Sequence, residues 1–375
     1  MNIVRSISHG FLLHRGGEAA LYKVESASGK LYTLKLYNSG TAFDTDVIGT
    51  IAVGTVAGAY RIAEYGEIDG SAYILYDYID GVCSREISPM PLAFALHSLR
   101  RVVATLTELQ KKGISHGDIN PDNIFFDKGG NPILIDFGIC GPGAPKYSAP
   151  ERLDGQHASE KADMFSLGAL FFFWLTGETL FDGNDFDEIR EKLLSTDKVN
   201  PNKILYGKID SGLAIKPEDL SLLEPLWKGL LAADPECRLE NLEELDELLE
   251  IALDAQGGQG VHLARQTELM GVTISGILEK NGTKTLENVE FPFFEQEKQK
   301  KSPLKKGLLT AAVFIFLVIA AICVFLARGE TPSIDETGEA LLQKSRSHEM
   351  GMPDSEKMPD LEGVLKKLSP EESER

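Results

Sequence analysis

The chain contains the run HGDINPDN at residues 116–123, which places the polar side chains of Asp118 and Asn123 in a short, proline-containing stretch. Apolar residues follow at 124–126 and again at 133–135, and both groups are typical of short buried strands. Polar residues in a loop that rigid elements hold in place are often functional. The run therefore predicts a loop whose side chains are positioned for chemistry.

Two further runs follow: DFG at residues 136–138 and APE at residues 149–151. In this order and at this spacing, the three runs resemble the catalytic loop, the metal-binding loop and the end of the activation segment of a protein kinase. The resemblance covers about residues 8–253. It implies a two-lobed α+β fold, with a small β-rich N-lobe at 1–78 and a larger helical C-lobe at 79–255.

The resemblance also implies an activity, the transfer of the γ-phosphate of ATP to Ser/Thr hydroxyls of proteins. Asp118 matches the aspartate that orients the acceptor hydroxyl, and Asn120 lies beside it as a second catalytic candidate. Asn123 and Asp136 match the two ligands of Mg²⁺, a cation that prefers oxygen. Lys35, in the alternating stretch 31–37, matches the lysine that holds the nucleotide phosphates.

Two other regions complete the expected nucleotide site. Gly16 and Gly17 stand where the family has its phosphate-covering loop, in which glycine allows backbone N–H groups to approach phosphate closely. Asp77 and Tyr78 match the hinge between the lobes, whose backbone groups bind the adenine edge, and Tyr76 matches the residue at the back of the pocket.

The sequence departs from the family in four places. The glycine loop is incomplete, and the expected helix at 44–58 contains no glutamate to pair with Lys35, so that Asp46 is the nearest candidate carboxylate. Asn120 stands where Ser/Thr kinases have a lysine, and Ala144 stands where they have a threonine. In the family this threonine forms a hydrogen bond with this lysine. We interpret the loss of both as a paired loss, because no buried group is left without its partner.

These departures leave two alternatives to an active Ser/Thr kinase. A pseudokinase would bind partners or nucleotide as a scaffold, without phosphate transfer. A small-molecule phosphotransferase shares the HGDxxxxN pattern but usually lacks a segment like APE. The four groups that hold phosphate, metal and nucleophile, namely Lys35, Asp118, Asn123 and Asp136, are all present and favour the active kinase.

Three supporting features are expected from the resemblance. Asp163 should bond the backbone of the catalytic loop, and Arg238 should pair with Glu151. Gly117 occupies the place where regulated kinases carry an arginine, and residues 139–146 contain no Ser, Thr or Tyr. Activity is therefore expected not to depend on phosphorylation of this segment.

Composition excludes some other functions. The formal net charge of the 375-residue chain is −19, which disfavours nucleic acid as a general partner. The chain has four cysteines, Cys83, Cys140, Cys237 and Cys323. They form no CxxC pair or His/Cys cluster, so we expect reduced thiols in a cytosol and no structural zinc.

The apolar run at 308–327 carries no charge and is long enough to cross a ~30 Å hydrocarbon core as a helix. Five lysines lie within 298–306, whereas Arg328 alone follows closely, and this asymmetry places the preceding side in the cytosol. We therefore expect a single-pass membrane protein with a juxtamembrane linker at 256–307, one transmembrane helix and an extracytoplasmic, disordered tail at 328–375. A buried core helix is the alternative for the apolar run.

Overall fold

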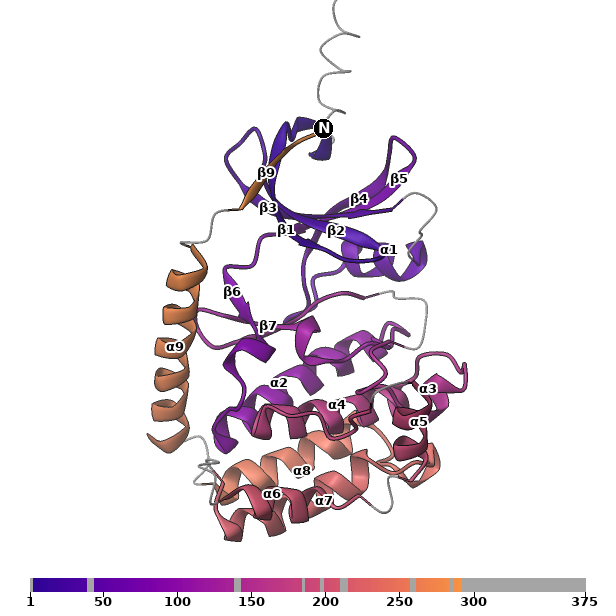
Figure 1. Ribbon diagram of the computed structural model, residues 1–375, viewed down its shortest axis with the longest axis vertical. Helices are drawn as coiled ribbons and strands as arrows, with labels where there is room; N and C mark the ends of the chain where they lie inside the picture. Colours follow the sequence, from indigo (N-terminus) through magenta and orange to yellow (C-terminus); the bar gives the residue numbers. More distant parts are fainter. Residues whose placement is uncertain are drawn as a thin grey trace, which may run out of the picture. The chain divides into compact units, whose positions relative to one another are not determined.

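The computed structural model describes residues 3–38, 44–137, 143–183, 186–195, 199–209, 215–256, 261–282 and 286–291. They form a β-sheet lobe followed by a helical lobe, as Figure 1 shows. The expected two-lobed α+β fold is therefore confirmed for this part of the chain.

The N-lobe is built on an antiparallel sheet with the strand order β4-β5-β3-β2-β1-β9. Its strands are β1 His9–Arg15, β2 Ala19–Glu25, β3 Leu31–Tyr37, β4 Ile62–Ile68, β5 Ser71–Asp77 and β9 Glu287–Glu290. Successive side chains of a strand point to opposite faces of the sheet. Along β3, Tyr37 accordingly joins the apolar cluster shared with the C-lobe, whereas Leu34 joins a second cluster on the other face.

Helix α1, Thr45–Val53, is shorter than the expected 44–58. Asp44 caps it, because its carboxylate accepts hydrogen bonds from the backbone N–H groups of the second and third helical residues. Gly54 follows in an extended conformation, and glycine and β-branched residues after Val53 are poor helix formers. Ile48 and Ile51 anchor the helix, since both are buried.

The C-lobe helices are α2 Leu92–Gln110, α3 Pro150–Leu153, α4 Glu160–Thr176, α5 Phe186–Leu194, α6 Pro201–Lys208, α7 Leu220–Leu230 and α8 Leu242–Ala255. Helix α4 is buried at every position from Ala162 to Thr176, as expected for a helix that is apolar on all sides. Helices α2 and α7 pack against α4, and α8 packs against α2 and α7.

A small sheet supports the loop at 116–123. Its strands are β6 Gly81–Cys83, β7 Ile124–Asp127 and β8 Pro132–Leu134, in the order β6-β7-β8. β7 and β8 correspond to the two apolar groups that the sequence predicted to be strands. The catalytic-loop run thus ends directly on a buried strand.

The segment expected to be a linker, 256–307, contains a helix and a strand. Helix α9, Val261–Gly282, packs against α2 and β6, and β9 pairs antiparallel with β1. Figure 1 shows α9 beside the C-lobe and β9 at the N-lobe sheet. We call α9, β9 and Phe291 the strap. The range predicted as a juxtamembrane linker thus contains two ordered elements, and apolar side chains of α9 recur at helical spacing and are buried.

The strap is attached at both ends. Helix α2 begins after Pro91 without a side-chain cap, and the Gln266 side chain of α9 accepts the hydrogen bond of the Phe94 N–H at 3.1 Å.

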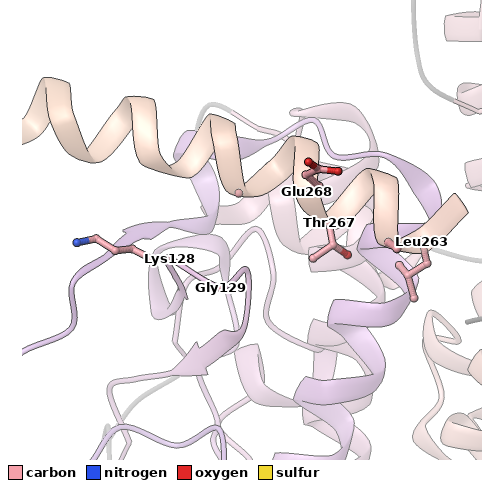
Figure 2. A pocket seen from close by; sticks show the side chains of 7 residues that line it. Lys128, Gly129, Leu263, Thr267 and Glu268 are labelled. Atoms are coloured by element: carbon pink, nitrogen blue, oxygen red, sulfur yellow. The ribbon is translucent and has the colours of Figure 1, made fainter. Parts of the chain in front are cut away.

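An open hollow of 550 Å³ lies between α9 and the β7–β8 turn, and Figure 2 shows Lys128 and Gly129 on one side of it and Thr267 on the other. None of the residues that line the hollow is an expected site residue.

Among the helices in the described part of the chain, none has the length and apolar character that a bilayer crossing requires. The expected membrane span, 308–327, and the expected tail, 328–375, lie outside the described residues.

Candidate active site

Asp163, on the first turn of α4, fixes the backbone of the catalytic loop. Its two carboxylate oxygens accept hydrogen bonds from the N–H groups of His116 and Gly117, each at 2.8 Å. Burial raises the pKa of Asp163 above its ordinary value, although the two N–H donors oppose the shift. The contact expected from the sequence is confirmed.

His116 links the loop to the segment that carries Asp136. The N–H of Asp118 donates to His116 Nδ1 at 3.2 Å, so the ring proton is on Nε2, which donates to the carbonyl of Ile135 at 2.9 Å. The ring also packs against Phe137, with centroids 4.9 Å apart. These contacts set the position of Asp136 relative to Asp118.

The Asp118 carboxylate accepts three hydrogen bonds. Oδ1 accepts from Asn120 Nδ2 at 3.0 Å and from the backbone N–H of Ala144 at 2.7 Å, and Oδ2 accepts from Asn123 Nδ2 at 2.8 Å. Burial raises the pKa of Asp118, and the Ala144 N–H opposes this shift. The carboxylate is therefore held in one orientation.

Ala144 supplies from its backbone the donor that the family supplies from a threonine hydroxyl. The backbone comes this close to Asp118 because residue 143 is a glycine. Gly143 has φ +75°, and an added Cβ there would lie 2.8 Å from the Asp118 carboxylate. The sequence did not show this contact, since no side chain carries it. Asn120 is buried, and its side-chain oxygen accepts a hydrogen bond from the Asp122 N–H at 2.9 Å, which caps the following turn.

Asn123 and Asp136 offer oxygen atoms suited to Mg²⁺. A carboxylate can only accept hydrogen bonds, so the contact with Asp118 fixes Asn123 with its nitrogen toward Asp118 and its oxygen directed elsewhere. Asp136 is 24% exposed and can therefore be reached by a ligand. In the described part of the chain no group of three His, Cys, Asp or Glu residues could hold a metal ion. Mg²⁺ is usually held by one or two protein oxygens together with phosphates and water.

Lys35 forms its ion pair with Asp136 and not with a carboxylate of α1. Asp46 is exposed on the first turn of that helix, and Asp44 is its cap. The inward face of α1 consists of apolar residues such as Ile48, so the structure does not bring Asp46 to the site. The assignment of Asp46 to nucleotide binding is therefore corrected.

Gly16 and Gly17 lie in the exposed turn between β1 and β2, where an added Cβ at Gly17 would meet no atom within 4 Å. The turn is closed by the Gly16 N–H, which donates to the carbonyl of Ala19 at 2.9 Å. Neither glycine has a positive φ, so this turn does not itself require glycine. The expected role of Gly16 and Gly17 in covering phosphate stays a prediction.

The N–H groups of Asp77 and Tyr78 form hydrogen bonds with other backbone groups of the N-lobe. They donate to the carbonyls of Arg61 and Leu31, at 3.0 and 3.3 Å. The Asp77 carboxylate pairs with Lys30 as well as with Arg61. These two residues therefore stabilise the end of the sheet, and their N–H groups are not available to a nucleotide base in this structure.

Tyr76 is buried in the sheet, and its expected position at the back of a nucleotide pocket stays a prediction. Its ring stacks on Tyr60, with centroids 4.3 Å apart and planes 5° apart. Both rings are buried, and burial raises the pKa of Tyr76 well above its ordinary value.

The activation segment ends on a buried ion pair. Arg238 donates to both oxygens of Glu151, at 2.6 and 2.8 Å, and also to the carbonyl of Lys161 at 2.8 Å. The predicted pair is confirmed. Gly117, at φ +77°, leaves no space for an arginine, since an added Cβ would lie 2.9 Å from Ala158.

Comparison with known proteins agrees with this geometry. The protein kinase domain family matches residues 56–249. The chain is 27% identical to the serine/threonine-protein kinase PrkC of Bacillus subtilis, over 70% of this chain and 43% of PrkC. It is 26% identical to PknD of Mycobacterium tuberculosis, over 54% of this chain and 34% of PknD. It is 23% identical to the probable serine/threonine-protein kinase PknB of Lactococcus lactis, over 72% of this chain and 46% of PknB.

The chain spans less than half the length of these three relatives. The family match begins at residue 56, after the incomplete glycine loop, Lys35 and most of the expected helix without glutamate. The matched residues include the catalytic loop, Asp136 and the Glu151–Arg238 pair, and the range 56–249 makes up more than half of the 375-residue chain. The chain therefore belongs to the protein kinase domain family.

Proposed function

We propose that this protein transfers the γ-phosphate of ATP to Ser/Thr hydroxyls of protein substrates, with Mg²⁺ as cofactor. The observation that carries the proposal is the carboxylate of Asp118, which three donors hold in one orientation within a buried loop. A fixed acceptor is what alignment of an attacking hydroxyl requires. The names of the bacterial Ser/Thr kinases that resemble the chain support the substrate class.

The other residues have separate roles in this proposal. Lys35 binds nucleotide phosphate through its ammonium group, and the oxygens of Asn123 and Asp136 hold Mg²⁺. Bound Mg²⁺ would neutralise charge on the phosphates. Asn120 stabilises the Asp118 carboxylate as a neutral donor, which stabilises developing charge less than the lysine of other Ser/Thr kinases. We therefore expect slow transfer.

We further propose that the kinase domain acts at the cytosolic face of a membrane. The support is the uncharged run at 308–327 and the lysines that precede it. Reporter fusions after residue 302 and after residue 340 should report opposite sides of the membrane. The same compartment for both fusions would refute the membrane-spanning part of the proposal.

The test of catalysis compares Asp118→Asn with Asp154→Asn in the purified chain. Both changes remove one carboxylate, but Asp154 is a surface residue that pairs with Arg190. Phosphate incorporation from labelled ATP into a generic protein substrate should fall by about 100-fold or more in Asp118→Asn and stay unchanged in the control. Equal incorporation by wild type and Asp118→Asn would refute the proposal.

A specific observation favours the pseudokinase as the second candidate. Lys35 pairs with Asp136, one of the proposed Mg²⁺ ligands, and α1 provides no carboxylate to draw it away. Such a site can bind nucleotide without transferring phosphate. Nucleotide binding by wild type, with no incorporation above that of Asp118→Asn, would identify this alternative.

A further inference from the structure

The strap connects the two lobes a second time. The chain first crosses from the N-lobe to the C-lobe between β5, which ends at Asp77, and β6, which begins at Gly81. It returns through α9, which packs on α2 and β6 of the C-lobe, to β9, which pairs with β1 of the N-lobe (Figure 1). Lobes that share one short connection can rotate about it as a hinge, and a second connection removes part of that freedom.

The return connection is short. Helix α9 ends at Gly282 and β9 begins at Glu287, so the four residues 283–286 join them. An extended chain covers at most about 3.6 Å per residue, which limits the distance between these two ends to about 18 Å. The lobes can therefore part further at the strap only if β9 leaves β1 or α9 leaves the C-lobe.

The C-lobe end of the strap is the firmer of the two. Helix α9 has 22 residues, and its Met270 and Ile274 are buried in the main apolar cluster. Its Gln266 also accepts the hydrogen bond from the Phe94 N–H at the start of α2. In contrast, β9 has four residues, lies at the edge of the sheet and is followed by one buried anchor, Phe291. We therefore expect the strap to open at β9, since local opening begins where least apolar surface is buried.

The proposed nucleotide site draws its residues from both lobes. Lys35 lies on β3 of the N-lobe, whereas Asp118, Asn123 and Asp136 belong to the C-lobe. The ion pair between Lys35 and Asp136 accordingly joins the two lobes. A ligand that both lobes hold leaves when the lobes move apart, so a restraint on this movement slows its release.

From this double connection we propose that the strap controls nucleotide release: ADP leaves the site when β9 detaches from β1, and is retained while β9 is paired. The proposal rests on the proposed function, because it takes a nucleotide as the ligand of the site. It adds a form of regulation that does not require phosphorylation of the activation segment. Product release limits the turnover of many enzymes, so the strap would then set the rate of the whole cycle.

The first test opens the strap. Phe291→Ala removes the anchor of β9, and stopped flow on the full chain follows the release of a fluorescent ADP analogue. We expect release at least about tenfold faster than in wild type, which corresponds to about 1.4 kcal/mol. Ile68→Ala is the matched control, because Ile68 is buried in the same cluster as Phe291 but lies on β4, at the opposite edge of the sheet. Its rate of release should equal that of wild type.

The second test holds the strap closed. His9 and Glu290 are paired residues of β1 and β9, and both are exposed. Opposed residues of antiparallel strands have Cα atoms about 4.5–5.5 Å apart, a separation that a disulfide can span. In the double variant His9→Cys with Glu290→Cys, oxidation confirmed by mass spectrometry should slow release by about tenfold or more, since the detached state becomes inaccessible. Reduction should restore the rate, and the two single variants, oxidised in the same way, control for the native cysteines.

The outcomes separate the strap from the proposed function. Faster release in Phe291→Ala together with slower release in the oxidised double variant supports control by the strap. This role is refuted if Phe291→Ala releases the analogue like wild type, if Ile68→Ala accelerates release as much, or if the disulfide leaves the rate unchanged. A wild-type chain that does not bind the analogue would refute the proposed function itself, and the role of the strap with it.

Discussion

Replacing Phe291 by alanine tests whether the strap is an integral part of the N-lobe. Phe291 is 4% exposed, packs edge-on against Tyr22 with ring centroids 5.1 Å apart, and donates its N–H to the carbonyl of Ser8 at 3.0 Å. Gly10 makes space for it, because an added Cβ there would lie 3.0 Å from the Phe291 ring. We expect Phe291→Ala to release β9 from β1.

The size of the effect follows from burial and from the position of β9. Truncation of a buried phenylalanine to alanine lowers the free energy of unfolding by about 3–5 kcal/mol. β9 has four residues and lies at the edge of the sheet, so it can detach while the rest of the lobe stays folded. The loss is then limited to the docking energy of the strap, and we expect the lower end of that range, about 3 kcal/mol.

Urea denaturation measures the loss, and hydrogen exchange locates it. The backbone of residues 9–12 pairs with β9, so its amide protons should exchange faster in Phe291→Ala. Val272→Ala is the control, because Val272 lies on α9 of the same strap but is 68% exposed, and its loss should stay within about 0.5 kcal/mol. If Phe291→Ala matched this control in both measurements, the strap would not be held by Phe291.

Three further predictions concern the C-lobe. Glu151→Gln should lower the free energy of unfolding by about 3–5 kcal/mol, because it leaves the Arg238 guanidinium buried beside a neutral group; a loss below about 1 kcal/mol in chemical denaturation would contradict this. Asn120→Lys combined with Ala144→Thr should raise the transfer rate more than the single changes predict, because both residues donate to one oxygen of the catalytic aspartate. Strict additivity in that double-mutant cycle would show that the positions act independently. Phosphatase treatment should leave the rate unchanged, since Gly117 offers no cation to an added phosphate, and a large drop would refute this.

The sequence predicted the C-lobe well because its functional residues lie in short contiguous runs. The HGDINPDN run identified Asp118 and Asn123, and their mutual contacts follow from a spacing of five residues within one loop. Arg238 and Glu151 are 87 residues apart, yet both were found because each lies in its own recognisable motif. Local order in the sequence was sufficient for these predictions.

Contacts without a side-chain signature could not be predicted. The donor from Ala144 is a backbone N–H, and the pairing of β9 with β1 joins segments separated by more than 270 residues. The strap did carry a signal: Leu263, Met270 and Ile274 recur at helical spacing and are buried. That pattern could have predicted α9, but not the surface against which it packs.

The charged groups of the site bear on the choice between an enzyme and a scaffold. Replacing a buried ion pair by apolar residues is often neutral or stabilising, so the stability of the fold does not require Lys35 and Asp136 to be buried together. Where the threonine of the family is missing, another group of the chain contacts the charge, because the Ala144 N–H donates to Asp118. A domain that served only as a scaffold would gain nothing from satisfying these charges in place of removing them. The satisfied network therefore favours a site that still binds and positions a charged ligand.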